Sequence, residues 1–229
     1  MTDSREGVLA AVTRGIRAGV LPPGARLEHP GAPPAVDRVA DREGMIESFA
    51  LELSKLSGSV HRVGSDAEAI ATVRALTAER GATRVLAWDD PWLQPASIGD
   101  ALRADGVMLE SCTLPASRDE RAARLQSLDP VLVGLTGAHA ALADTGSVVV
   151  ISGPGRGRIA SLLPPTHIAV VRADQLYPSL GAFLAANRDI AEIGANMVVI
   201  TGPSRTGDIE GTLVLGVHGP GDLHVVLIG

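Results

Sequence analysis

The chain has 229 residues, one cysteine and a formal net charge of −6, and 45% of its residues are hydrophobic. This length and hydrophobic content are typical of one large globular domain with a sizeable core, and they exclude a disordered chain. Aromatic residues make up only 2%, and no basic stripe is present. Nucleic acid is therefore not expected as a partner, because its binding needs clustered cations and stacking side chains.

The single cysteine, Cys112, excludes an intramolecular disulfide and an iron–sulfur cluster ligated only by this chain's cysteines. We interpret it as a small hydrophobic residue rather than a nucleophile. No apolar run approaches the roughly 20 residues of a membrane-spanning helix. The N-terminus carries Asp3 and Glu6 where a signal peptide would carry cations. We therefore expect a cytoplasmic protein with no membrane partner.

The N-terminal segment differs in composition from the rest of the chain. Val8, Leu9, Val12 and Ile16 recur at helical spacing and predict a short amphipathic helix. Residues 21–37 are dense in Pro and Gly, which predicts an irregular connection. We accordingly expect an N-terminal helix and connection over residues 1–41 and one domain over 42–229. The helix either packs on that domain or serves a partner.

From residue 42 onward, helices and strands alternate in the predicted pattern. Gly58 is expected to end the first helix as a left-handed cap residue, and Ser65 and Ser117 open later helices in capping-box patterns. Such alternation indicates parallel βαβ units in an open sheet with helices on both faces. The strands expected in this half are residues 59–63, 84–88, 106–110 and 131–135.

The second half has more strands and fewer helices. One clear helix is expected at about residues 177–187. This shift indicates a second, more antiparallel lobe or an extension of the sheet. The strands expected in this half are residues 146–152, 167–171, 197–201, 212–217 and 223–228.

The most polar loop of the chain, residues 202–211, follows a predicted strand. Ligands of parallel sheets bind beyond the carboxyl ends of the strands, which makes this loop a candidate site. Ser204 and Thr206 can cap a following helical turn, whose amides would attract an anion. Arg205 can hold a carboxylate or phosphate. The alternative is an ordinary capped turn in which Arg205 pairs with acidic neighbours, and a nucleophilic role for Ser204 has no GxSxG motif behind it.

Three further side chains near this loop can move protons. Asp208 and Glu210 lie within the loop, and His218 follows it beside a glycine-rich turn. His218 and His224 are six residues apart and could meet across that turn. Because no HExxH or CxxC pattern accompanies them, we expect no metal and no cofactor. His167 is expected to be a hydrogen-bonded, partly buried residue.

Two other glycine motifs stand out. Thr145 and Gly146 predict a tight turn into a strand. The GPGRGR run at residues 153–158 reads either as a mobile, basic substrate loop or as a solvated hairpin. It departs from the GxGxxG pattern, so a dinucleotide site is not expected there.

Four segments together resemble a known family. They are ADTGSVVV (143–150), SLLPPTHIAVV (161–171), ITGPSRTGDIEGTLVLGVHGPGDLHVVLI (200–228) and GMIESFALELSKLSGSVHRV (44–63). These segments resemble the LutC/YkgG family of lactate-utilisation proteins, which carry the LUD domain, over about residues 44–229. The resemblance implies a NagB/RpiA/CoA-transferase-like α/β fold. It also implies oxidation of L-lactate to pyruvate with two sister proteins, one of which carries cysteine-ligated iron–sulfur clusters.

The resemblance also marks a site region. We expect Glu210, Asp208 and His218 to be catalytic, and we expect a small carboxylate or phosphate to be bound by Thr145, Gly146, Gly202, Ser204, Arg205 and Thr206. The function expected is a non-redox subunit of a lactate-oxidising system. The alternatives are a stand-alone isomerase or acyl transferase acting on a phosphorylated or acyl substrate, and a regulatory or scaffolding protein. Pro203, Gly219 and Pro220 also occupy family motif positions.

Overall fold

A computed structural model describes residues 41–207 except 94 and 96, residues 213–229, and residues 7, 9, 10, 13 and 14. The chain divides into two units, Met1–Pro34 and Ala35–Gly229. The described residues of the first unit are helical, and Thr13 Oγ1 donates a hydrogen bond to Leu9 O at 2.8 Å. They agree with the helix expected there. The connection at residues 21–37 lies outside the described residues.

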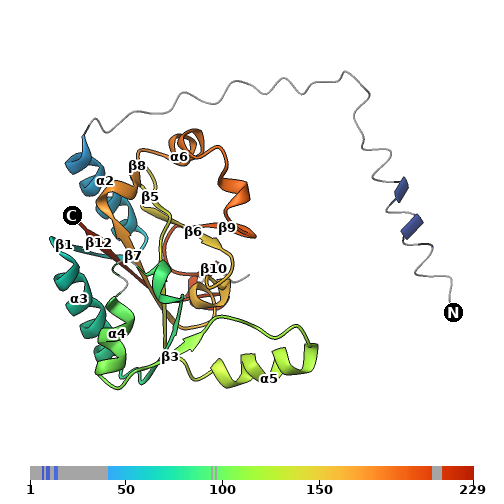
Figure 1. The fold of residues 1–229 in the computed structure, drawn as a ribbon. Helices are drawn as coiled ribbons and strands as arrows, with labels where there is room; N and C mark the ends of the chain where they lie inside the picture. The colour runs from blue at the N-terminus through green and yellow to red at the C-terminus, as the bar shows by residue number, and fades with distance from the viewer. Residues whose placement is uncertain are drawn as a thin grey trace. The chain divides into compact units, whose positions relative to one another are not determined.

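A six-stranded, fully parallel sheet forms the centre of the second unit (Figure 1). Its strands are hydrogen-bonded to one another in an order that differs from their order along the chain. This sheet confirms the predicted α/β class with a mostly parallel sheet. In spatial order the strands are β1 (Ser59–Val63), β12 (Asp222–Ile228), β7 (Thr166–Arg172), β4 (Val133–Gly137), β2 (Arg84–Ala87) and β3 (Met108–Ser111).

The helices of the βαβ half lie where the sequence predicts them. Ser65 and Ser117 are the N-caps that the sequence predicts, whereas the Asp41 cap was not predicted. The Asp41, Ser65 and Ser117 side chains each accept a backbone N–H at a helix start. The predicted cap at Gly58 is wrong by one residue, because Ser57 takes the left-handed conformation with φ of 67°. These helices are α2 (Arg42–Lys55), α3 (Asp66–Glu79), α4 (Ser97–Ala104) and α5 (Arg118–Leu128).

The second half adds a mixed sheet, as the shift in composition predicts. This four-stranded sheet has the order β8–β5–β6–β9, and its β5–β6 and β6–β9 pairs are antiparallel. A two-stranded antiparallel ribbon and the helix α6 (Leu180–Ala186) complete it. The strands are β5 (Ala140–Leu142), β6 (Ser147–Ser152), β8 (Leu176–Tyr177), β9 (Asn196–Ile200), β10 (Arg205–Gly207) and β11 (Leu213–Leu215).

The core lies on both faces of the parallel sheet. One cluster packs α3, α4 and α5 against the sheet through residues such as Val73, Leu102 and Leu128. A second cluster packs α2 against the opposite face of β7 and β12, through Phe49 and Leu53. Covering both faces explains why these strands read as continuous apolar runs. Of the helices in the described part of the chain, none is long and apolar enough to cross a membrane.

Candidate functional site

The polar loop at residues 202–211 follows β9, which is not a strand of the parallel sheet as expected. β9 pairs antiparallel with β6 and belongs to the mixed sheet, so the rule for carboxyl ends of parallel strands does not apply to it. The loop continues as the strand β10, which pairs with β11 through Arg205 and Leu215. The expected helical turn with anion-binding amides after Ser204 is therefore wrong, because these amides belong to a β-ribbon.

The loop is joined through its backbone to the segment around His218. Ser204 N donates to Pro220 O at 2.7 Å, and Gly216 N donates to Ser204 O at 2.9 Å. Gly202 has φ of 115°, and a Cβ there would lie 3.0 Å from Leu56 Cβ. Only glycine takes this conformation without strain beside α2. The two backbone hydrogen bonds therefore hold the loop next to the His218 segment.

A cavity of about 230 Å³ lies between this loop and the amino ends of β7 and β12. Three of the predicted site residues, Gly202, Ser204 and His218, line it, which brings together groups that are 16 residues apart in the sequence. The His218 residue is exposed and Ser204 is half-buried. The full lining consists of Ser161, Leu162, His167, Val199, Ile200, Thr201, Gly202, Ser204, His218, Gly219, Pro220 and Leu223.

His167 is the cavity residue that sequence reasoning missed as a site residue. It is the second residue of the buried strand β7 and is 1% exposed. Its Nε2 lies 2.9 Å from Thr136 Oγ1, whereas its Nδ1 is buried and has no hydrogen-bond partner among the described residues. An unpaired buried polar atom costs about 1–3 kcal/mol. The signal in the sequence was this single histidine at the start of an otherwise apolar strand.

Burial determines the protonation state of His167. Removal from water lowers the pKa of this histidine to about 4, so the ring is neutral at pH 7. A neutral imidazole has one N–H and one lone pair. When the Thr136 hydroxyl donates to Nε2, the proton resides on Nδ1, and a residue of the cavity lining then has an N–H without a partner among the described residues. The arrangement suits a ligand oxygen placed beside this N–H.

The other predicted site residues lie around the cavity or outside the described part. The Ser147 hydroxyl lies 2.8 Å from Thr145 Oγ1 and 2.9 Å from Thr201 Oγ1, so Thr145 connects to the cavity lining through two hydroxyls. Gly146 forms the predicted turn with φ of 63°, and a Cβ there would lie 2.2 Å from Leu53 N. The absence of a side chain at Gly146 therefore allows the turn to pack closely against α2.

Arg205 is exposed and stands outside the cavity lining. Its Nη2 donates to Ser57 Oγ at 3.1 Å, beside the end of α2. Asp208 and Glu210 lie outside the described residues, as does the side chain of Thr206. The clamp that Arg205 would supply and the proton transfer expected of Asp208 and Glu210 therefore stay predictions.

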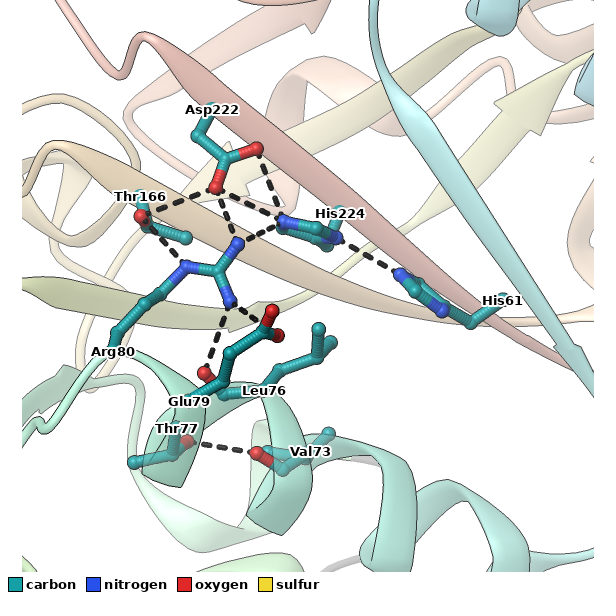
Figure 2. Close-up of polar contacts among 9 residues, drawn as sticks. All are labelled: His61, Val73, Leu76, Thr77, Glu79, Arg80, Thr166, Asp222 and His224. Carbon is teal, nitrogen blue, oxygen red and sulfur yellow. Dashed lines mark hydrogen bonds and ion pairs between the residues drawn. The ribbon is translucent and has the colours of Figure 1, made fainter.

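A second polar network lies on the opposite face of β12 (Figure 2). Arg80, at the end of α3, donates to Asp222 and to Thr166, and its Nε lies 3.1 Å from Thr166 Oγ1. His224 Nε2 lies 3.0 Å from the Asp222 carboxylate, and His224 Nδ1 lies 2.9 Å from His61 Nε2. Burial opposes ionisation of Asp222, but the hydrogen bonds from Arg80 and His224 outweigh it and hold its pKa below the usual range.

This network links its members to one another and explains how the cavity wall is held. The cation, the carboxylate and the two histidines each find partners within it, as expected of a structural contact. It ties the amino end of β12 to α3. Because side chains alternate along a strand, Asp222 and His224 face this network while Leu223 faces the cavity. His218 and His224 therefore do not meet, contrary to the possibility raised by their spacing.

Metal binding and thiol chemistry find no support in the described residues. Among the described residues, no group of three or more His, Cys, Asp or Glu side chains is arranged to hold a metal ion. Cys112 is buried, and its Sγ lies 3.0 Å from Ala87 O. Burial, with help from Asp89, raises the pKa of this thiol to about 12. The prediction of an inert, packed cysteine is confirmed.

The fold and the cavity define an α/β protein with a parallel six-stranded sheet and a small cavity at the amino ends of two strands. The sequence model of the LUD domain matches residues 46–228, and the chain therefore belongs to the LUD domain family. This match confirms the resemblance noted from four segments of the sequence.

Several relatives of this chain are named lactate utilization protein C. The chain is 32% identical over 157 residues to a lactate utilization protein C from Geobacillus sp. (strain WCH70), and the match covers 65% of this chain and 64% of that protein. It is 36% identical over 113 residues to a lactate utilization protein C from Deinococcus radiodurans, covering 49% and 53% respectively. The chain thus spans less than two thirds of the length of these relatives.

A solved structure shares the fold. The crystal structure of a DUF162 family protein from Deinococcus radiodurans matches with a TM-score of 0.54 at 19% identity, covering 83% of this chain and 100% of that chain. At this identity the likeness concerns the fold alone. It supports the sheet and flanking helices described above.

Proposed function

We propose that this protein is a non-redox subunit of a system that oxidises L-lactate to pyruvate, and that it binds a small carboxylate in the His167 cavity. The observation that carries the proposal is the buried Nδ1 of His167, which has no partner among the described residues and belongs to a residue that lines the cavity. The names of the relatives support a role in lactate utilisation, and the cavity supports the binding of a small ligand. The sister subunits, including an iron–sulfur protein, are part of the proposal.

A few polar groups in a largely apolar lining fit a small carboxylate with a short apolar tail. Its wall combines the neutral ring of His167 with the Ser204 hydroxyl and the exposed His218, while Leu162, Ile200 and other apolar side chains complete the lining. A carboxylate oxygen accepts hydrogen bonds only, so it matches the N–H and O–H donors that these groups offer. A short apolar tail then contacts the aliphatic lining.

The assignment of the redox step to a partner follows from cysteine content. An iron–sulfur cluster is held by four cysteine thiolates in its common form, whereas this sequence contains Cys112 alone. The Cys112 thiol is also buried and protonated at neutral pH. Electrons that pass through cysteine-bound clusters therefore pass through another subunit, and this chain contributes ligand binding or assembly.

Titration calorimetry with L-lactate and pyruvate tests the proposal, with the protein alone and with its sister subunits. The His167→Phe variant keeps an aromatic ring but removes both ring nitrogens, and we expect at least about tenfold weaker binding, the equivalent of one lost hydrogen bond. The matched control is His61→Phe on β1, because His61 belongs to the network on the opposite face of β12. This control should bind as the wild type does.

Two results would overturn the proposal. The first is equal affinity of His167→Phe and the wild type, which would move the ligand away from this cavity. The second is an absence of binding by the protein and by its complex, together with normal growth on lactate of a strain lacking the protein. A turnover assay on sugar phosphates and thioesters addresses the alternative of a stand-alone isomerase or acyl transferase.

A further inference from the structure

Two histidines on neighbouring strands contact each other on the face of β12 opposite the His167 cavity (Figure 2). Ser59 of β1 is the register partner of His224, so His61, two residues further along, lies on the same face of the sheet. His61 Nε2 lies 2.9 Å from His224 Nδ1, and the ring centroids are 5.1 Å apart. Because His224 is buried and His61 is half-buried, this contact lies largely inside the protein.

The other ring nitrogen of His224 faces a donor and an acceptor at once. Arg80 Nη2, which carries N–H groups only, contacts His224 Nε2 directly. The Asp222 carboxylate, which accepts hydrogen bonds only, lies 3.0 Å from the same nitrogen. A neutral ring therefore satisfies one of these neighbours and opposes the other. When Nε2 holds the proton it meets the Arg80 N–H groups, and when it holds a lone pair it meets the carboxylate.

Protonation of the His224 ring changes these contacts, because both of its nitrogens then carry N–H groups. The Nδ1–H donates to a neutral His61. The Nε2–H donates to the Asp222 carboxylate, and the opposite charges strengthen this hydrogen bond. The Arg80 guanidinium, in contrast, then faces a second cation and is repelled. One proton thus favours His224 over Arg80 as the partner of Asp222.

The groups around the two rings favour a single proton on the pair. Burial, His224 and Arg80 together lower the pKa of His61, so this ring stays a neutral acceptor. Despite burial, the hydrogen bonds from Arg80 and His224 hold the pKa of Asp222 below its usual range, so the carboxylate stays charged. The groups come from three further elements and are Asp222 on β12, Arg80 and Glu79 at the end of α3, and the uncharged Thr166 on β7.

Arg80 joins the end of α3 to the sheet. It is the C-cap residue of α3, and its Nη1 donates to Leu76 O within the helix at 3.1 Å. Its Nε donates to Thr166 Oγ1 at 3.1 Å, and its Nη2 donates to Asp222 Oδ2 at 2.5 Å. The Arg80 side chain is 19% exposed. Water and the exposed Glu79 can therefore receive its N–H groups when Asp222 changes partner.

The buried Arg156 has the opposite arrangement. The turn of residues 153–156 directs it inward, and the residue is 3% exposed, so this loop is neither a solvated hairpin nor an open basic loop. Its Nη2 donates to Ile193 O at 2.8 Å, and its guanidinium lies 3.8 Å from the centre of the Trp92 ring. Arg156 takes part in none of the ion pairs between described residues. Exchange of a carboxylate between a cation and a histidine is thus a feature of the Arg80 network.

We propose that the His61–His224 pair is a proton-operated switch of the contact between α3 and β12. When the pair is uncharged, Arg80 holds Asp222 and ties the end of α3 to the sheet. Uptake of one proton from solvent by His224 transfers Asp222 to the imidazolium and releases Arg80. Only hydrogen bonds and the position of this proton change. The inference goes beyond the function proposed for the His167 cavity and does not depend on it.

Two measurements on the full chain test the switch between about pH 8 and pH 5, the range in which histidines titrate. NMR of the histidine rings follows the protonation of His224. Amide hydrogen exchange follows the end of α3, where Gly81 N donates to Ala78 O and Ala82 N donates to Thr77 O. After correction for the intrinsic effect of pH, exchange at Gly81 and Ala82 should rise at least about tenfold with the midpoint of His224, because one charge-assisted hydrogen bond is lost. Amides of α6, which packs on the mixed sheet, should not respond.

Asp222→Asn keeps the shape of the side chain but removes the anion that the protonated ring binds. We expect the midpoint of His224 to fall by about one pH unit or more, the equivalent of a charge-assisted hydrogen bond. Exchange at Gly81 should be raised throughout the pH range and lose its dependence on His224. Asp105→Asn is the matched control, because Asp105 pairs with Arg74 on the same helix. It should leave the midpoint of His224 unchanged.

Three results would overturn the proposal. They are a His224 ring that does not titrate in this range, a ring that titrates while the exchange of Gly81 stays constant, and an unchanged midpoint in Asp222→Asn. If Asp222→Asn fails to fold, His61→Phe replaces it, because this variant keeps a ring but removes the acceptor of the His224 Nδ1–H. The midpoint of His224 should again fall, and an unchanged midpoint would contradict the switch.

Discussion

At the scale of single residues, the difference between satisfied and unsatisfied polar groups separates structural from candidate ligand-binding side chains. Arg80, Asp222 and His224 contact one another on one face of β12. His167 Nδ1 and Arg156 Nε are buried and lack partners among the described residues. Buried groups are normally paired, and the unpaired Nδ1 of His167 is therefore the basis of the ligand site that we propose.

The neutral state of His167 should make the protein sensitive to acid. Its folded-state pKa is about 4, whereas an unfolded histidine has a pKa near 6.5. At a pH between these two pKa values, the histidine is protonated in the unfolded chain and neutral in the folded protein. The free energy of unfolding therefore falls as the pH decreases. Each such group contributes a slope of about 1.4 kcal/mol per pH unit. His139, with a pKa also about 4, adds to this slope.

The His167→Gln variant isolates the contribution of this residue. Glutamine can still hydrogen-bond to Thr136 but does not titrate. Between about pH 6.5 and 4.5, the dependence of the unfolding free energy on pH should therefore become less steep by about 1.4 kcal/mol per pH unit, which corresponds to one proton. Urea unfolding at several pH values measures it. An unchanged slope in His167→Gln would show that this ring does not resist protonation in the folded state.

At the scale of elements, the sequence predicts where strands and helices lie but not how strands pair. The strand that precedes the polar loop was correctly placed, yet it joins the mixed sheet antiparallel to β6. A local run of apolar residues contains no information about its partner strand. The prediction of a helical turn after Ser204 was wrong for the same reason. Residues that cap helices also occur in β-turns, and pairing with β11 makes this segment a strand.

The close approach of β4 to the 3₁₀ helix Arg158–Ser161 depends on one glycine. A Cβ added at Gly134 would lie 1.8 Å from Ala160 O, so alanine cannot fit without displacing the backbone. We expect Gly134→Ala to lower the free energy of unfolding by about 1–3 kcal/mol, as for other overpacked cores. Thermal or urea unfolding measures the change.

The matched control for this prediction is Gly181→Ala in α6. A Cβ at Gly181 meets only the Ser179 hydroxyl, at 3.8 Å, so the methyl group has room. Alanine is the better helix former by about 0.5–1 kcal/mol. The two glycine replacements should therefore have opposite signs, and destabilisation by both would mean that close approach is not the cause at Gly134.

At the scale of the whole molecule, the chain consists of two units, and the LUD domain match lies entirely within the second. We expect residues 35–229 to fold alone, with a melting temperature within a few degrees of the full chain. Circular dichroism and thermal unfolding of this fragment test the expectation. A fragment that is unfolded at room temperature would show that the first 34 residues contribute to the stability of the domain.

The same fragment tests the alternative of a scaffolding role for the N-terminal helix. If this helix binds a sister subunit, residues 35–229 should fold but fail to form the complex. If the LUD domain itself forms the contact, the fragment should associate as the full chain does. Analytical size-exclusion chromatography with the sister subunits distinguishes the two results.

The amino-acid sequence by itself determined the α/β class, most element positions, the helix N-caps and the membership of the family. These properties depend on local periodicity, capping chemistry and matching segments, which neighbouring residues specify. Only the tertiary structure decided which groups meet. The last strand, β12, is inserted beside the first, and pairing between residues far apart in sequence brings the His218 segment to His167. The inward turn of Arg156 likewise depends on packing against His139 and Trp92.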